Sequence, residues 1–173
     1  MIEPNGTIKG LQNRSNSNYE AGSVSAIKKN EWIHIALVLQ GSTIRFYTNG
    51  KQTQSNSVSG SANNSTKPFF IGSQSDSSGN SIYSFDGLIS NARFVNGTAV
   101  YPDGTEFTPP TEPLTAITNT KLLCCQSKDS STAVAVTPSA LSTHGNVRAT
   151  DVNPYDIGDV HPQESSHCVM NDN

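Results

Sequence analysis

The residues best suited to bind a metal ion lie near the end of the sequence. His161, His167 and Cys168 carry imidazole and thiol groups, which are the ligands that zinc prefers. A structural zinc site uses four such ligands at characteristic spacings. This segment offers three, without a recognised spacing, so the sequence predicts no metal site.

The other two cysteines, Cys124 and Cys125, are neighbours on a predicted strand. Successive side chains of a strand point to opposite faces of the sheet, so no disulfide is expected between them. We expect both to act as small hydrophobic side chains, one buried and one partly covered.

The patterns that mark nucleophilic and phosphate-transfer enzymes are missing from the sequence. There is no Gly-x-Ser-x-Gly elbow and no Gly-rich phosphate loop. His34 lies in a run that predicts a core strand, where a structural histidine is favoured over a catalytic one. Asp86 stands alone, and Asp156-x-x-Asp159 lies in the C-terminal tail. These observations favour a protein without enzymatic activity.

The rest of the chain can be arranged around the stretch at residues 30–51, NEWIHIALVLQGSTIRFYTNGK. Its apolar run, residues 32–39, favours a central strand covered on both faces, with Trp32 in the core. Residues 43–48 alternate between apolar and polar side chains, as a strand with two distinct faces does. Asn49-Gly50 is the strongest short signal for a tight hairpin. The region is predicted to be a three-stranded antiparallel meander.

Beyond this meander, shorter apolar runs predict further strands. They lie at residues 69–71, 81–94, 120–124 and 132–137. Within the second run, Gly87 is expected to mark a bulge or a close backbone approach, and Arg93 is expected to be held by hydrogen bonds. The proline-rich stretch 107–113 should run extended along a sheet surface. Polar loops such as residues 73–81, held on a rigid scaffold, are where recognition is usually found.

The order of these motifs resembles laminin-G-like modules of the concanavalin A-like lectin and glucanase superfamily, in particular those of tail-fibre and other structural proteins of marine bacteriophages. The resemblance covers residues 31–126. Its motifs are Trp32-x-His34-x-Ala36-x-Val38, Ile44-x-Phe46-Tyr47-x-Asn49-Gly50, Phe70-Ile71-Gly72, residues 85–93, residues 97–101, Phe107-Thr108-Pro109-Pro110 and Leu122-Leu123-Cys124-Cys125. The resemblance implies an all-β fold, an antiparallel β-sandwich of the jelly-roll type.

The first thirty residues depart from that family pattern. They leave room for at most two short strands, so the N-terminal half of the sandwich is expected to be shortened. We expect an N-terminal segment of short strands or an arm at 1–30 and a laminin-G-like sandwich at 31–126. A C-terminal extended arm at 127–173 is expected to be ordered only where it touches a partner.

The resemblance also bears on the chemistry of the site. The glucanase branch resembles a strand carrying Glu-x-Asp-x-x-Glu, and no such spacing occurs here. Many laminin-G-like modules hold calcium, but the acidic ligand often comes from the early strands that are shortened here. No cofactor is therefore predicted. A lectin needs aromatic or polar groups that converge on a rigid groove. The candidate glycan-binding residues are Tyr83, Asn91, Tyr101 and Asp103.

Composition narrows the choice of partners. A formal net charge of −3, with no basic cluster, gives no electrostatic reason to bind nucleic acid. No apolar run approaches the roughly 20 residues that span a bilayer, and the N-terminus lacks the features of a signal peptide. We expect a protein made in a host cytoplasm, with neither nucleic acid nor membrane as a partner.

Two interpretations remain open. The first is a non-enzymatic structural protein on the surface of a bacteriophage virion, as a capsid decoration or as part of a tail or fibre appendage. Its terminal segments would contact other virion proteins and further copies of the chain. The second is a carbohydrate-binding lectin module that recognises a host surface glycan.

Overall fold

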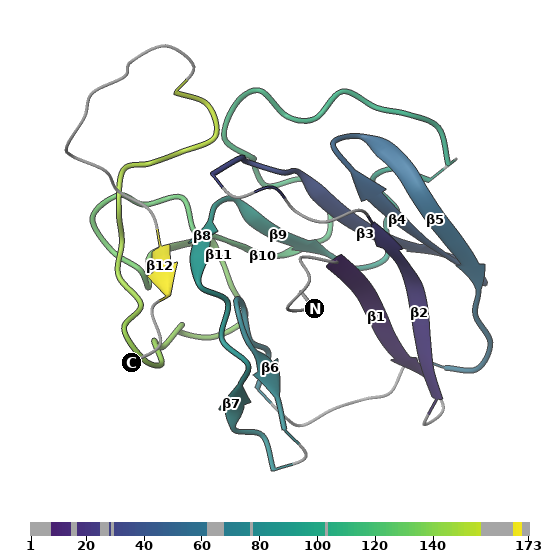
Figure 1. Cartoon of the computed structure of the whole chain (residues 1–173), viewed down its shortest axis with the longest axis horizontal. Helices are drawn as coiled ribbons and strands as arrows, with labels where there is room; N and C mark the ends of the chain where they lie inside the picture. The colour runs from purple at the N-terminus through teal and green to yellow at the C-terminus, as the bar shows by residue number, and fades with distance from the viewer. Residues whose placement is uncertain are drawn as a thin grey trace. The chain divides into compact units, whose positions relative to one another are not determined.

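The computed structural model describes residues 8–14, 17–24, 28, 30–61, 68–76, 78–102, 104–156 and 168–170. In this part of the chain the fold is all-β, and every pair of strands is antiparallel (Figure 1). The described residues contain no helix long and apolar enough to cross a membrane. The predicted fold class is therefore confirmed.

The strands are β1 (Ile8–Arg14), β2 (Ser17–Val24), β3 (Ile35–Gln40), β4 (Thr43–Thr48), β5 (Lys51–Ser57), β6 (Gln74–Ser75), β7 (Ser81–Ile82), β8 (Gly87–Ile89), β9 (Ala92–Val95), β10 (Thr120–Cys124), β11 (Val134–Val136) and β12 (Cys168–Met170). They form two three-stranded sheets, ordered β3-β4-β5 and β11-β10-β9, and the pairs β1-β2, β6-β7 and β8-β12.

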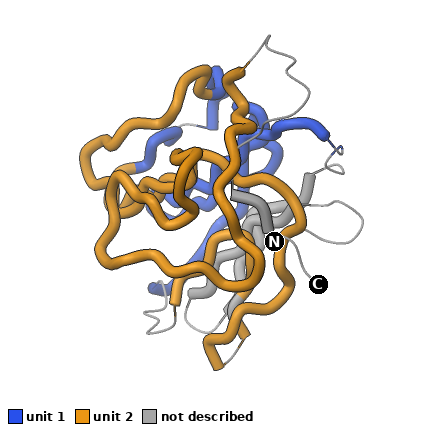
Figure 2. Tube along the Cα trace, turned by 90° about the vertical axis from the view of Figure 1, so that its left-hand side faces the viewer, with its two compact units in different colours: residues 1–66, 99–109 blue, residues 67–98, 110–173 orange. Residues whose placement is uncertain are grey.

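The chain divides into two compact units, shown in Figure 2. Unit 1 contains residues 1–66 and 99–109, and unit 2 contains residues 67–98 and 110–173. The predicted domain boundaries at 30/31 and 126/127 stay predictions.

The meander β3-β4-β5 of unit 1 confirms the predicted three-stranded topology. Asn49 and Gly50 have φ of 48° and 79°, the positive values that a type I′ turn needs at both central positions. The Asn49 side-chain oxygen also accepts a hydrogen bond of 2.9 Å from the His34 backbone N–H. In return, the backbone N–H of Asn49 donates to the His34 carbonyl. The turn thereby fixes the entry to β3 as well as the hairpin.

The strand covered on both faces is β4, whereas the prediction placed it at residues 32–39. Ile44 and Phe46 on one face and Tyr47 on the other are all at most 1% exposed. β2 lies against β4 and β5, and the Tyr47 ring packs against those of Tyr101 and Phe107. Phe107 N–H donates to the Gly50 carbonyl, so the first part of the predicted stretch 107–113, which belongs to unit 1, lies against this sheet.

Trp32 does not lie in the core, so that prediction is wrong. β3 begins only at Ile35, and Trp32 is 38% exposed on the segment that precedes it. β3 is an outer strand of its sheet, and its alternate residues Ile35, Leu37 and Leu39 are also exposed. The apolar run reflects one exposed apolar face together with one inner face, where Val38 is buried.

Unit 2 corrects two predicted strands. Residues 69–71 form no strand, and the run 81–94 is divided into β7, β8 and β9. The breaks fall at Tyr83 and Asn91, which have φ of 52° and 56°. Gly87 begins β8 and marks no bulge, but a Cβ there would lie 2.7 Å from the Phe85 ring, so the predicted alternative of a close approach at Gly87 fits. A left-handed residue turns the chain out of a ladder, so three short strands replace one long one.

The predicted closing strand of unit 2 is present as β10, and the predicted edge strand as β11. β10 pairs with β9 on one side and β11 on the other, and its Leu122, Leu123 and Cys124 are buried. Arg93 on β9 donates to the Thr115 carbonyl at 3.0 Å, which confirms its predicted hydrogen-bonded role. β1 and β2 show that the first thirty residues do hold two strands.

The two neighbouring cysteines differ in burial as predicted, Cys124 being buried and Cys125 half-buried. Their predicted orientation toward opposite faces is wrong. Cys125 ends the strand with φ of 59°, and its Sγ lies 3.6 Å from the Sγ of Cys124. The left-handed residue breaks the alternation that a continued strand would impose.

Candidate functional site

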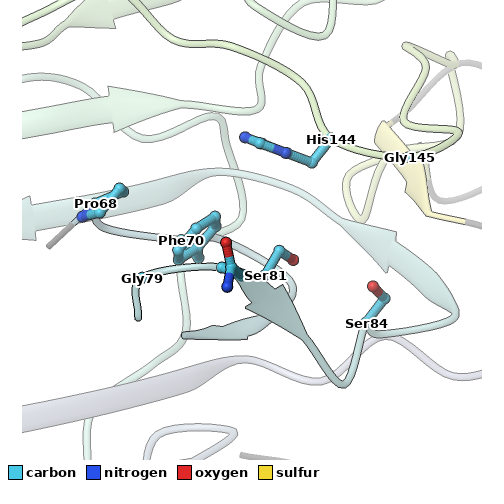
Figure 3. Close-up of a pocket in the computed structure, with 8 residues that line it drawn as sticks. Pro68, Phe70, Gly79, Ser81, Ser84, His144 and Gly145 are labelled. Carbon is cyan, nitrogen blue, oxygen red and sulfur yellow. The ribbon is translucent and has the colours of Figure 1, made fainter. Parts of the chain in front are cut away.

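A hollow of about 450 Å³ is built from loops of unit 2 (Figure 3). One stretch of chain supplies most of its wall, and a second, later stretch supplies His144 and Gly145. The lining consists of Pro68, Phe70, Gly79, Asn80, Ser81, Ser84, His144 and Gly145. Its volume falls within the range of about 300–1,000 Å³ that is usual for small-molecule sites.

The two rings of the pocket come from distant parts of the sequence. Phe70 and His144 have centroids 5.9 Å apart and planes inclined by 67°, an edge-to-face contact. Such a contact is attractive, because the positive edge of one ring meets the negative face of the other. It ties the later stretch to the wall that residues 68–84 form.

The polar wall is held by the hairpin between β6 and β7. The Asp76 carboxylate accepts hydrogen bonds of 2.8 Å from the N–H groups of Ser78 and Asn80, and one of 2.9 Å from the Asn80 side-chain amide. Asp76 N–H in turn donates to the Asn80 carbonyl. The Asn80 amide therefore has its N–H₂ group engaged at Asp76, and its carbonyl oxygen is the acceptor left to a ligand.

These hydrogen bonds also act on the Asp76 carboxyl group itself. The hydrogen bond from the Asn80 side chain has the largest effect and lowers the pKa of Asp76 below its ordinary value. The hydrogen bonds from the backbone N–H groups of Asn80, Ser78 and Gly79 lower it further. Asp76 is therefore ionised at neutral pH, and its charge is committed to shaping the loop.

The lining combines a flat apolar ring with groups that donate and accept hydrogen bonds. The Ser81 hydroxyl donates to Ser73 Oγ at 2.8 Å, whereas the Ser84 side chain is exposed. No carboxylate, lysine or arginine is among the lining residues in the described part of the chain.

Exposed aromatic side chains directly adjoin pocket residues in the sequence. Phe69, between Pro68 and Phe70, is 75% exposed, and Tyr83, just before Ser84, is 80% exposed. Phe69 also packs on Phe94, with ring centroids 6.3 Å apart. Large exposed rings next to a hollow are a feature of binding surfaces.

Tyr83 is thus the predicted glycan-binding residue that lies nearest in sequence to this pocket. Asn91 also belongs to unit 2, but its side-chain oxygen accepts hydrogen bonds from Leu114 N–H and the Gln126 amide. The Asn91 side chain therefore connects neighbouring segments of unit 2 by hydrogen bonds.

The other two predicted residues come from the part of the sequence that returns to unit 1. The Tyr101 ring stacks on Phe107 with a centroid distance of 3.6 Å, and its carbonyl accepts a hydrogen bond from the Tyr47 hydroxyl. Tyr101 is half-buried in this aromatic cluster. Asp103 lies outside the described residues.

The sequence points to the loop at residues 73–81, which contains Asn80, as a place where recognition is usual, but it does not point to Phe70, Ser84 or His144. The Ser-, Gly- and Asn-rich composition of that loop was the available signal. No such signal marks His144, because it lies in the segment 127–173, which the sequence predicts to be an extended arm. Only the folded chain brings it to the Phe70 ring.

Metal ligands do not gather in the part of the chain that the structure describes. No group of three or more His, Cys, Asp or Glu side chains there could hold an ion. His161 and His167 lie outside the described residues, and only the backbone of Cys168 is described.

Comparison with protein families gives one match. The model of the Concanavalin A-like lectin/glucanases superfamily matches residues 2–102. This match includes the first thirty residues, which the motif resemblance left out, and it stops before Phe107. No curated protein and no solved structure gives a significant match to the chain.

Proposed function

The chain belongs to the concanavalin A-like lectin/glucanases superfamily, and from this premise we propose that the pocket of unit 2 binds carbohydrate without cleaving it. The observation that carries the proposal is the meeting of an aromatic ring, an imidazole, an amide and a hydroxyl in one hollow of about 450 Å³. Sites for small polar molecules combine apolar walls with a few polar groups in this way.

The chemistry of a sugar ring matches these groups. A pyranose has a C–H face, which packs on an aromatic ring, and a rim of hydroxyl groups. Phe70 offers the ring, while the Ser84 hydroxyl, the Asn80 carbonyl and the His144 imidazole offer hydrogen-bond partners. The lining carries no carboxylate, lysine or arginine side chain, which suits an uncharged polyol.

The absence of a carboxylate from this lining supports a binding role over hydrolysis. Glycoside hydrolysis generally uses two carboxyl groups, about 5–9.5 Å apart, on either side of the scissile bond. Ser81 donates to Ser73, and no hydrogen bond in the described residues joins His144 to Ser81 or Ser84. We expect no release of reducing sugar from β-glucans. Release above the buffer level that is abolished by replacing a single Asp or Glu would contradict this.

A glycan array with fluorescently labelled protein tests the binding proposal. We expect the wild-type chain to bind a defined set of glycans, and Phe70→Ala and Ser84→Ala to lose that signal. Ser42→Ala is the matched control, since Ser42 is an exposed turn residue of unit 1. Retention of full binding by both pocket variants would contradict the proposal.

We further propose that the module is displayed on a bacteriophage particle, as a capsid decoration or a fibre component that contacts a host glycan. The order of motifs at residues 31–126 supports this setting, as does a surface rich in Ser and Asn with few charges. Negative-stain images of particles labelled with an antibody against this chain test it. Unlabelled particles, with the chain found only in lysate, would contradict the setting.

Virion proteins assemble by repeated contacts, and β3 offers a surface for one between copies of the chain. Ile35, Leu37 and Leu39 on one face are 36–44% exposed, and β3 pairs with β4 on one side only among the described strands. An open apolar strand favours addition of another strand. Analytical ultracentrifugation at micromolar concentration should show self-association that Leu37→Arg weakens. A monomeric wild-type chain would contradict it.

A further inference from the structure

The pocket wall at residues 79–81 uses its hydrogen-bond donors inside its own hairpin. Gly79 N–H donates to the Asp76 carbonyl at 3.1 Å, and Asn80 N–H donates to the Asp76 carboxylate at 2.8 Å. The Asn80 side-chain amide donates to the same carboxylate at 2.9 Å, and the Ser81 hydroxyl donates to Ser73 Oγ at 2.8 Å. These donors are therefore engaged before any ligand arrives.

The same contacts leave oxygen atoms of this wall as acceptors. An ionised carboxylate can only accept hydrogen bonds, so the Asn80 amide must turn its N–H₂ group to Asp76 and keep Oδ1 for other partners. Ser81 Oγ, whose proton is engaged at Ser73, likewise keeps lone pairs. Both Asn80 and Ser81 line the hollow. We call Asn80 Oδ1 and Ser81 Oγ the acceptor pair.

The electrostatic surroundings of the acceptor pair favour a positive group. Asp76 is ionised at neutral pH and is joined to Asn80 by a hydrogen bond. No lysine or arginine is among the lining side chains in the described residues. The face of the Phe70 ring, also in the lining, attracts cations through the ring quadrupole. A group rich in donors is therefore favoured beside Asn80 and Ser81, and an anion is disfavoured.

Building on the carbohydrate binding proposed above, on which this inference rests, we propose that the pocket selects amino sugars whose amino group is free. An ammonium group offers three donors and no acceptor, so it matches the acceptor pair. A hydroxyl group offers one donor, so a neutral sugar binds less tightly. An acetamido group offers one N–H and adds a carbonyl oxygen, for which the acceptor pair has no donor. A carboxylate would bring charged oxygens against these acceptors, close to Asp76.

Three oligosaccharides of equal length, with the same β-1,4 linkage, test this order. They differ at C2 alone, which carries an amino group, a hydroxyl group or an acetamido group. Calorimetric titration of the full chain at about pH 6 keeps the amine protonated and Asp76 ionised. We expect the amino form to bind tightest. The acetamido form should bind at least about tenfold more weakly, which corresponds to one hydrogen bond to a charged group.

Ser73→Ala tests whether Ser73 sets this preference through Ser81. Ser73 does not line the pocket, and its removal releases the Ser81 proton to donate to an acetamido carbonyl. The ratio of the amino to the acetamido affinity should then fall by about 2- to 10-fold. A loss of structure alone would weaken both ligands equally, and Ser42→Ala should leave both affinities unchanged. Phe70→Ala should lose all three ligands, which separates pocket binding from the attraction of a polycation to a chain of net charge −3.

The outcomes separate this preference from carbohydrate binding itself. Equal affinities, or tighter binding of the acetamido form, would overturn the preference and leave the pocket a carbohydrate site. Binding of other glycans on an array, with none of the three bound, would do the same. Binding of the amino form that Phe70→Ala leaves unchanged would place it outside the pocket and overturn the preference too. If no glycan binds at all, the proposed function fails together with this inference.

Discussion

The β3-β4-β5 meander of unit 1 and the loop-built pocket of unit 2 are specified in different ways. The meander is made of consecutive strands joined by a two-residue turn, and each strand pairs with its neighbour in sequence. The pocket depends on a carboxylate that bonds to its own loop and on two rings about seventy residues apart in sequence. Local pattern thus encodes the first region, and specific side-chain contacts encode the second.

Mutations should therefore have different effects in the two regions. In the meander, substitutions should change the free energy of unfolding, because buried rings and turn geometry stabilise the sheet. In the pocket, substitutions should change ligand affinity with little effect on unfolding, since the lining residues are half-buried or exposed.

The largest effect is expected from Phe46→Ala on β4. The ring is 1% exposed, and removal of a buried aromatic side chain typically costs about 3–5 kcal/mol. Chemical denaturation followed by tryptophan fluorescence measures it. Trp32→Ala, followed by circular dichroism, is the comparison and should cost less than about half as much, because Trp32 is 38% exposed. Equal costs would show that Trp32 belongs to the core after all.

The second effect concerns the tight turn. A Cβ at Gly50 would lie 1.8 Å from the Phe107 carbonyl oxygen, and Gly50 also has φ of 79°. Gly50→Ala should therefore cost about 2–4 kcal/mol, from the left-handed conformation and the forced shift of Phe107. Gly41→Ala is the matched control, since Gly41 has φ of 56° but nothing within 4 Å of an added Cβ, and about 1–2 kcal/mol is expected. Thermal melting of both variants side by side gives the difference.

The third effect belongs to the pocket and depends on pH. The pKa of Asp76 is lowered in the folded chain, so its hydrogen bonds are fully present above the ordinary value of 3.8 and are lost as the pH falls through the lowered folded-state value. Glycan binding should therefore persist from neutral pH to about pH 5 and fail in stronger acid. Asp76→Ala should abolish binding at neutral pH while the meander remains folded. Full affinity in Asp76→Ala would show that the β6-β7 hairpin is not part of the binding site.

The smallest effect is expected at Tyr83. Its ring is 80% exposed, so Tyr83→Ala should change the free energy of unfolding by less than about 0.5 kcal/mol. If the ring stacks on a bound sugar, affinity should fall by about 2- to 10-fold. Calorimetric titration with the best glycan from an array measures this. An unchanged affinity would limit the site to the hollow itself.

The same contrast explains what the sequence could and could not reveal. Asn49-Gly50 predicted the hairpin and the alternation at 43–48 predicted β4, because both depend on neighbours in the chain. Trp32 was misplaced because an apolar run does not distinguish a buried strand from an outer strand with one exposed face. Burial depends on which elements lie next to the strand, and these come from elsewhere in the sequence.

In unit 2 the errors came from residues that leave the usual backbone conformations. Tyr83 and Cys125 adopt positive φ although their residue types seldom do, whereas Asn91 is of a type enriched there without being bound to it. The same turns break the run at 81–94 and bring the sulfurs of Cys124 and Cys125 together. His144 was missed for a related reason, since its contact with Phe70 exists only in the folded chain.

Chemical-shift mapping by NMR with the glycan that binds best tests the central claim most directly. We expect shifts concentrated at the backbone amides of Phe70, Asn80, Ser84 and His144, with the β3-β4-β5 amides unchanged. Asp76→Ala should erase those shifts and leave the meander spectrum in place. Shifts centred on Tyr101 and its neighbours in unit 1, with none at the pocket, would contradict it.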